Sequence, residues 1–260
     1  MPSQHKPMAP VRRAKTPDPE PSFLRYKVGD TEIAALYDGI WEKVHDAQYF
    51  GNATVGETKH ARLTTEFVPI PITVFAVKLN SKLILCDAGG GGQVQAFNAN
   101  SDFVSRKMVA TMKAADIDPR AVETISVSHF HHDHIFGLLE RKTSAPVFLG
   151  AEIIVPAAEY KWWTDPLVIT RLPEARRPLA RRIHADVSRW RNVLPVEDFV
   201  SAPGHTPGRT AFHLTSDNAE LMISNDAAYV PALCARHPEW HGAFDTGWTD
   251  SKGLPPQAAR

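Results

Sequence analysis

A cluster of four histidines and one aspartate constrains this chain more than any other feature. It reads His-Phe-His-His-Asp-His and lies at the end of a β-rich run at 121–129. Its residues of metal-binding type are His129, His131, Asp133 and His134. They cannot all share one face of a regular helix or strand, but a tight loop that leaves a strand can direct them to one point. Imidazole and carboxylate are ligands that a divalent metal such as Zn²⁺ takes, and a histidine-rich surface loop is the alternative.

The rest of the chain predicts alternating strands and helices. β-Branched and aromatic runs between turn residues predict strands at 31–39, 71–80, 82–92, 121–129 and 145–150. Apolar spacing predicts a helix at 103–117. The stretch 151–163 looks helical despite Pro156, and the basic stretch 171–190, broken by Pro173 and Pro178, is expected to form helical pieces on the surface. The stretches 197–216 and 220–230 are expected to form strands around a glycine-proline loop. This alternation predicts a mixed α/β layered fold that binds ligands beyond the carboxyl ends of its strands.

The composition argues against several kinds of partner. The 260 residues contain 29 Lys+Arg and 29 Asp+Glu, a balance that disfavours a nucleic-acid or anionic-membrane partner and favours a small-molecule substrate. Two cysteines do not make a disulfide scaffold. Residues 1–22 are rich in proline and charge and are expected to form a disordered tail before one domain at 23–260. Without a signal peptide or spanning run, the sequence predicts a cytoplasmic protein. A homodimer is left open.

Three further residues stand where strands end. His205 lies in the loop Pro-Gly-His-Thr-Pro-Gly, Asp226 follows the apolar run at 221–223, and Asp87 follows a buried strand. Each has an ordinary structural alternative, because histidine occurs in turns and aspartate caps them. The glycines at 89–92 lack the lysine of a phosphate-binding loop, so they are expected to form a close-packed turn. No Gly-x-Ser-x-Gly motif is present, which argues against a serine hydrolase.

These motifs together resemble one known family. The stretch "HFHHDH" fits the His-x-His-x-Asp-His signature of the metallo-β-lactamase superfamily. "LILCDAGGGG", "SAPGHTPGRT" and "LMISNDAAY" occur in that family's order, so the resemblance covers residues 23–230. Within the family, the chain looks most like the branch of methyl parathion hydrolase and acyl-homoserine lactone lactonase. The resemblance implies an α/β fold, the αββα sandwich of the metallo-β-lactamase type, with metals at the strand ends.

The resemblance also implies a set of ligands. His129, His131 and His205 would bind a first metal and leave a fourth position for water. A second metal would take Asp133 and His134. The expected metal is zinc, with manganese or iron as alternatives.

The remaining roles in the site follow from the same resemblance. Asp226 would bridge the two metals. Asp133 would also be catalytic, because it could orient the attacking hydroxide or protonate the leaving group. Asp87 would hydrogen-bond a ligand histidine or the histidine-containing loop.

Several neighbouring residues have no clear role in the sequence. Phe130, Trp162 and Trp163, with Tyr160, could line a substrate pocket or pack in the core. The two readings are equally supported. His132 and His213 are expected to be structural.

The end of the chain departs from the family pattern. The family supplies one more histidine for the second metal, after another helix. Here the short stretch after Asp226 contains His237 and His241 outside that context. Residues 254–260, "LPPQAAR", read like the first turn of a helix. We therefore expect a C-terminal truncation that removes the last helix and strand of the sandwich and weakens the second metal site.

The resemblance predicts hydrolysis by a zinc-bound hydroxide, with an ester, lactone or phosphotriester as substrate. One alternative is a degenerate metal-binding protein with little turnover. Another is a different branch of the family, such as a glyoxalase II-like thioesterase or a β-lactamase.

Overall fold

The structure, a computed structural model, describes residues 18–44, 50, 52–60, 67–92, 94–98, 101–105, 107–202, 204–228 and 230–242. Its strands are β1 (Phe23–Val28), β2 (Thr31–Val44), β3 (Phe67–Leu79), β4 (Lys82–Cys86), β5 (Val94–Asn98), β6 (Ser101–Ser105), β7 (Val122–Ser126), β8 (Glu152–Pro156), β9 (Val193–Val196), β10 (Val200–Ser201), β11 (Thr210–Ser216) and β12 (Ala219–Ile223). Its helices are α1 (Val55–His60), α2 (Met108–Ala114), α3 (His132–Ile135), α4 (Ala157–Thr164), α5 (Val168–Arg171), α6 (Arg177–Val187) and α7 (Pro231–Cys234).

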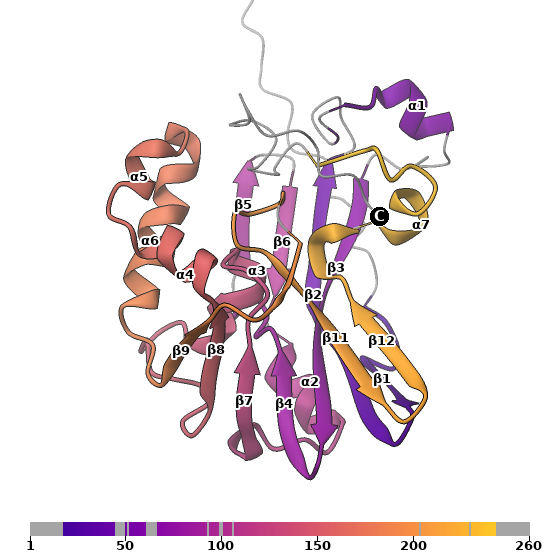
Figure 1. The fold of residues 1–260 in the computed structure, drawn as a ribbon. Coiled ribbons are helices and arrows are strands. Elements are labelled where there is room, and N and C mark those ends of the chain that lie inside the picture. Colours follow the sequence, from indigo (N-terminus) through magenta and orange to yellow (C-terminus); the bar gives the residue numbers. More distant parts are fainter. Residues whose placement is uncertain are drawn as a thin grey trace, which may run out of the picture.

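Most of the strands form one large mixed sheet. Their order is β5-β6-β2-β3-β4-β7-β8-β9, and β1 pairs with β2 as an antiparallel hairpin. From β4 onward the neighbours β4, β7, β8 and β9 run parallel to one another. Their carboxyl ends therefore meet along one edge, at the upper ends of the arrows in Figure 1. A mixed α/β fold is thus confirmed.

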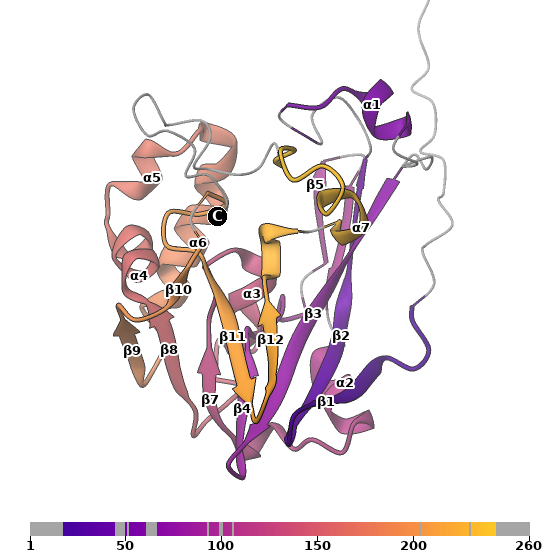
Figure 2. The ribbon, with the colours of Figure 1, turned by 45° about the vertical axis from the view of Figure 1, so that its right-hand side comes forward.

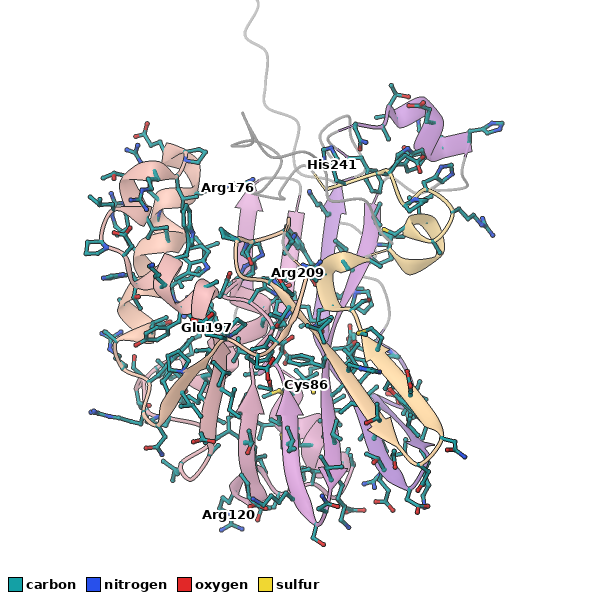
Figure 3. The ribbon with its side chains drawn as sticks, in the orientation of Figure 1. Cys86, Arg120, Arg176, Glu197, Arg209 and His241 are labelled. Atoms are coloured by element: carbon teal, nitrogen blue, oxygen red, sulfur yellow. The ribbon has the colours of Figure 1, made fainter. Side chains whose placement is uncertain are left out.

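A second, smaller sheet packs against the large one. Its order is β10-β11-β12, all antiparallel. Phe212 and Ile223 from this sheet pack with Ile33, Val77 and Cys86 from the large sheet. Figure 2 shows β11 and β12 in front of the large sheet, and Figure 3 places Cys86 near the middle of the molecule. The other side of the small sheet is exposed, at His213, Thr215, Glu220 and Met222.

Helices cover the opposite face of the large sheet. The main core joins Leu85 and Ile125 of the sheet to Met112 of α2 and Ile183 of α6, all fully buried. α6 buries one stripe, because Ala180, Ile183 and Val187 recur at helical spacing. Figure 1 shows α4, α5 and α6 together beside β8 and β9. The described residues thus form three layers, in the order helices, large sheet and small sheet.

Two of the predicted helices begin with a strand. The predicted helix at 103–117 is β6 followed by α2, because the backbone of β6 pairs with β2. The predicted helix at 151–163 is β8 followed by α4, and the strand ends at Pro156. β8 pairs on both sides, with β7 and β9, and these ladders outweigh the local helical spacing. The predicted strand at 145–150 is a turn region with one isolated bridge, between Leu139 and Pro146.

The last part of the predicted tail at 1–22 lies among the described residues, at 18–22. Asp18 forms an ion pair with Lys107, and the backbone N–H of Tyr37 donates to the carbonyl of Ser22 at 3.0 Å. Asp18 and Ser22 therefore contact the domain. Residues 1–17 and 254–260 lie outside the described residues. None of the described helices has the length and apolar character needed to cross a membrane.

Candidate metal centre

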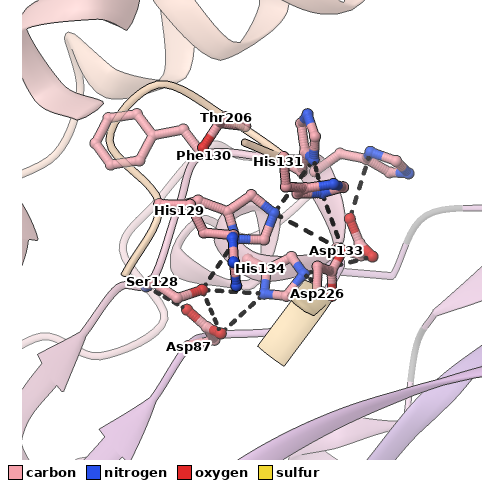
Figure 4. Close-up of polar contacts among 12 residues, drawn as sticks. Asp87, Ser128, His129, Phe130, His131, Asp133, His134, Thr206 and Asp226 are labelled. Atoms are coloured by element: carbon pink, nitrogen blue, oxygen red, sulfur yellow. Dashed lines mark hydrogen bonds and ion pairs between the residues drawn. The ribbon is translucent and has the colours of Figure 1, made fainter. Parts of the chain in front are cut away.

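The histidine cluster lies at the carboxyl end of β7, at the edge where the parallel strands end. The chain leaves β7 as an extended segment, 127–131, here called the histidine loop. His131 keeps extended dihedral angles, φ −71° and ψ 154°, and precedes the four-residue helix α3. The change from extended chain to helix turns successive side chains in different directions. His129 and His131 therefore project from the loop, whereas Asp133 and His134 project from α3 (Figure 4).

Three imidazoles and one carboxylate converge in a first group. His131 Nδ1 lies 3.2 Å from His129 Nε2 and 2.7 Å from His205 Nε2. Asp226 Oδ2 lies 3.1 Å from His205 Nε2. The ligand atoms of all four residues lie within 4.8 Å of one another.

A second group shares Asp226 with the first. His134 Nε2 lies 3.3 Å from Asp226 Oδ1 and 3.6 Å from Asp133 Oδ2. The ligand atoms of these three residues also lie within 4.8 Å of one another. Each oxygen of Asp226 therefore faces a different group, the arrangement expected of a carboxylate that bridges two cations.

The two groups draw their members from both sheets. His205 lies in the loop 204–209 between β10 and β11, here called the proline loop. Asp226 lies in the short 3-10 turn Asn225–Ala227 that follows β12. His129 lies in the histidine loop after β7, and His134 lies in α3, which follows that loop. The site thus lies where the ends of the large and small sheets meet.

Charge and burial favour neutral imidazoles in the first group. Burial, with the neighbouring histidines, lowers the pKa of His129 and of His131 well below the usual value. His134 differs, because the carboxylates of Asp226, Asp87 and Asp133 outweigh its burial and raise its pKa well above the usual value. Burial opposes ionisation of Asp226, yet His134 and His205 hold its pKa well below the usual value.

The residues present fit a divalent metal. His131 Nδ1 faces two other ring nitrogens, and a neutral imidazole has only one N–H to share among such contacts. A cation among these lone pairs would satisfy all of them. The carboxylates that attract a proton to His134 would equally attract a cation. Imidazole nitrogens and carboxylate oxygens are the donor set that zinc takes.

Asp87 holds the histidine loop and His134 together. It follows β4 and adopts a left-handed backbone with φ +66°. Its Oδ1 accepts the backbone N–H of Ser128 at 2.7 Å, and its Oδ2 accepts the Ser128 hydroxyl at 2.9 Å. Oδ2 also lies 2.8 Å from His134 Nδ1. If this nitrogen carries the proton, His134 Nε2 is free to face Asp133 and Asp226.

Glu159 is a site residue that the sequence analysis missed. It lies in the first turn of α4, and its side chain is fully buried. Its carboxylate joins the histidine loop to the proline loop through hydrogen bonds from Phe130 and Thr206. Burial raises its pKa, while its hydrogen-bond donors act in the opposite direction. In sequence it looks like any acidic residue near a helix N-terminus, so only the packing of the two loops against it reveals it.

Two of the three predicted substrate-pocket residues lie in the core. Phe130 is fully buried, with ring centroids 5.1 Å from Trp190 and 6.5 Å from Tyr160. Trp163 is 4% exposed, and its indole N–H donates to Glu159. Of the two alternatives that the sequence leaves open for Phe130 and Trp163, their burial in the core favours core packing. Trp162 is half-buried at the edge of the core, with the Arg171 guanidinium 5.7 Å from its ring centroid.

Three other described histidines, His213, His237 and His241, lie apart from the two groups. His237 stacks on Trp240, with ring centroids 3.9 Å apart. The backbone N–H of His241 donates to Asn52 at 3.0 Å, and Figure 3 shows His241 toward the upper end of the molecule. Among the described residues, neither joins a metal-ligand group. His213 is exposed on β11, where it lies 3.2 Å from Glu220.

A family model and a curated relative match this sequence. The family model, described as the metallo-beta-lactamase superfamily, matches residues 68–253. A hydroxyacylglutathione hydrolase from Pseudomonas entomophila (strain L48) is 30% identical over 116 residues. That segment is 44% of this chain and only 36% of the relative, so the similarity leaves most of the relative unmatched.

Two solved structures share the fold. The hydrolase AbOPH, of the beta lactamase superfamily, has a TM-score of 0.73 and 21% identity over 86% of this chain and 80% of its own. AidC, a dizinc quorum-quenching lactonase, has a TM-score of 0.71 and 23% identity over 86% and 81% of the two chains. At these identities the likeness concerns the fold alone.

Proposed function

Because this chain belongs to the metallo-β-lactamase superfamily, we propose that it is a metal-dependent hydrolase of an ester, lactone or phosphotriester. The observation that carries the proposal is the pair of ligand groups that share Asp226. A single cluster could be a structural metal site, whereas two groups joined by one carboxylate suit a site that acts on a substrate.

The candidate ligands would have different roles in such a site. One ion would be bound by His129, His131 and His205. Asp226 would bind both this ion and a second ion. A divalent metal bound there supplies a Lewis acid and activates water near neutral pH. We take zinc as the metal, with manganese or iron as alternatives.

Asp133 is the candidate for proton transfer. Its Oδ2 lies 3.6 Å from His134 Nε2, at the second group. From this position the carboxylate would orient the attacking water, accept its proton and then pass that proton to the leaving group. Asp87 would keep His134 in place through its 2.8 Å contact with Nδ1.

The substrate class follows from the motifs and agrees with the solved structures. The AidC structure is that of a lactonase with a bound product, and AbOPH is a hydrolase. A thioester is the second candidate, because the curated relative is a hydroxyacylglutathione hydrolase. All of these substrates present a carbonyl or phosphoryl centre that a Lewis acid polarises.

Metal analysis and a substrate panel test the proposal. The panel contains lactones, aryl esters, phosphotriesters, a glutathione thioester and the β-lactam nitrocefin. We expect bound divalent metal and turnover of at least one lactone, aryl ester or phosphotriester, with turnover lost on chelation. Turnover of the thioester alone would favour the second candidate. Bound metal without any turnover would favour a degenerate metal-binding protein.

A further inference from the structure

We infer that Glu159 is a positioning residue that sets the metal affinity of the site by fixing the histidine loop against the proline loop. The inference rests on the proposed metal site and adds a residue that touches none of the candidate ligands. Its strongest support is the number and origin of the groups that bind its carboxylate.

Four donors converge on the two oxygens of Glu159. Oε1 accepts the backbone N–H of Phe130 at 2.9 Å and the indole N–H of Trp163 at 2.7 Å. Oε2 accepts the hydroxyl of Thr206 and the backbone N–H of Gly208, both at 2.9 Å. Phe130 lies between His129 and His131, and Thr206 follows His205. Each oxygen therefore holds one ligand loop, within one residue of a candidate ligand.

Only a carboxylate can complete this arrangement. An ionised carboxylate accepts about four hydrogen bonds and donates none, which matches the four donors present. An amide of the same shape offers one accepting oxygen and one donating nitrogen. Glutamine at this position could therefore hold one loop but would set its N–H groups against the donors of the other.

The packing at Glu159 leaves the proline loop little room to relax. A Cβ placed on Gly208 would lie 2.2 Å from the backbone nitrogen of Glu159, so α4 and the proline loop touch through backbone atoms. The backbone N–H of Thr210, the first residue after the proline loop, also donates to the carbonyl of Ser128 in the histidine loop at 3.1 Å. Loss of the Glu159 contacts should thus shift the two loops relative to each other without separating them.

Asp38 provides a matched control. It is also buried, and it accepts four donors, from Gly90, Ser105, Lys107 and Met108. None of these donors lies in the histidine loop or the proline loop. Glu159→Gln and Asp38→Asn therefore make the same chemical change, but only the first acts on the loops that carry His129, His131 and His205. Asp38 instead binds Gly90 in the glycine turn beside α3, so the comparison applies to the tightly bound metal of the first group.

The experiment measures zinc affinity by competition with a chromophoric chelator, together with thermal stability of the metal-free protein. Loss of a group that positions a ligand typically costs about 10–100-fold in metal affinity. We expect a loss in that range for Glu159→Gln, and at most a few-fold loss for Asp38→Asn at comparable loss of stability. Thr206→Val, which removes a single donor, should lower affinity in the same direction by a smaller factor.

The outcomes separate this inference from the proposed function. A wild-type chain that binds no divalent metal would contradict the proposed function and this inference with it. Normal zinc affinity in folded Glu159→Gln would contradict the inference alone, as would an equal loss in Asp38→Asn. If Glu159→Gln does not fold, Thr206→Val decides the matter, and unchanged affinity in that variant would overturn the inference.

Discussion

Asp226 presents one carboxylate oxygen to each group of candidate ligands, so its position matters more than that of any single histidine. It lies one residue beyond Asn225, whose backbone is left-handed with φ +47°. That turn, at the end of β12, brings the carboxylate toward His205 in the proline loop of the same sheet and toward His129 and His134, which follow β7 of the large sheet. Within β12, successive side chains point to opposite faces of the sheet. A residue in the middle of the strand could therefore not have reached both groups.

A first prediction concerns His131, which contacts two other imidazoles of the first group. His131→Ala removes the shared nitrogen, so zinc binding and hydrolysis should be lost together. His213→Ala is the control, because His213 is an exposed histidine outside both groups. Metal content by elemental analysis and activity on the best substrate are measured for both variants. Zinc at wild-type stoichiometry in His131→Ala would rule out the assigned ligand set.

Part of the site was predictable from sequence because spacing alone brings some of its residues together. His129 and Asp133 are close in the chain, and a short loop after a strand restricts the positions that their side chains can take. Glu159 could not be found this way, because its environment consists of two loops that meet only in the folded chain. Phe130 was ambiguous for the same reason, since an aromatic residue between two ligands can point toward a pocket or into the core.

At the scale of elements, α3 depends on its neighbours for its position. A helix of four residues is too short to be stable alone. The backbone N–H of Ala88 donates to the carbonyl of His134 at 2.8 Å, and that of Gly137 donates to Gly89 at 2.9 Å. The glycine turn after β4 therefore fixes the helix that carries Asp133 and His134.

Gly137→Ala tests this dependence. An added Cβ would lie 1.8 Å from the carbonyl oxygen of Ala88, a backbone atom that cannot rotate away. We expect a loss of about 1–3 kcal/mol in unfolding free energy, as for other overpacked sites, together with weaker metal binding. Gly150→Ala is the control, because nothing lies within 4 Å of its added Cβ. Denaturant unfolding and metal content are measured on both, and equal stability of the two variants would contradict this account.

β3 and α6 were predicted as the right kind of element but with other bounds, since β3 begins at Phe67 and α6 occupies Arg177–Val187 of the predicted helical stretch at 171–190. The boundary at Pro156 was missed because the apolar residues of β8 and the first turn of α4 together imitate a single helix. What distinguishes them is the parallel pairing of β8 with β7 and β9, a long-range property that local spacing does not record.

At the scale of the whole molecule, metal binding and folding should be coupled, because the ligands come from segments distant in sequence. A ligand present at 100 times its dissociation constant stabilises a fold by about 2.7 kcal/mol. For a chain of this size that corresponds to a rise of about 5–10 °C in Tm. We expect such a rise with zinc and its reversal by a chelator, measured by differential scanning calorimetry. An unchanged Tm would mean that the groups do not bind the metal in the folded state.

Metal stoichiometry is a further prediction. The first group offers four side chains, whereas the second offers three, one of them shared. We expect one metal to remain after dialysis against a weak chelator and a second to be lost. Elemental analysis before and after dialysis measures this. Two tightly bound metals per chain would show that another residue completes the second group, and His237→Ala and His241→Ala would then test the two histidines that follow Asp226 in the sequence.

The pH dependence of activity is the last prediction. Activated water in such sites titrates near pH 7, so activity should rise with pH around an apparent pKa of about 7. The rise should vanish with the activity in His131→Ala. Initial rates between pH 5 and 9 measure it, and a flat profile would count against attack by a metal-activated water.

The meeting of the two sheets at the site has a mechanical consequence. The same ions would be bound by histidines that follow β7 and by Asp226, which follows β12. Bound metal would therefore connect the large sheet to the small sheet at one edge. The apolar contacts of Cys86, Phe212 and Ile223 are distributed over an area, so they separate gradually when the two sheets are pulled apart. A coordination bond is short-ranged and stiff. A force that pulls β7 and β12 apart would therefore be resisted first by the bonds between the ligands and the metal. The two sheets of the metal-free protein should separate at a lower force.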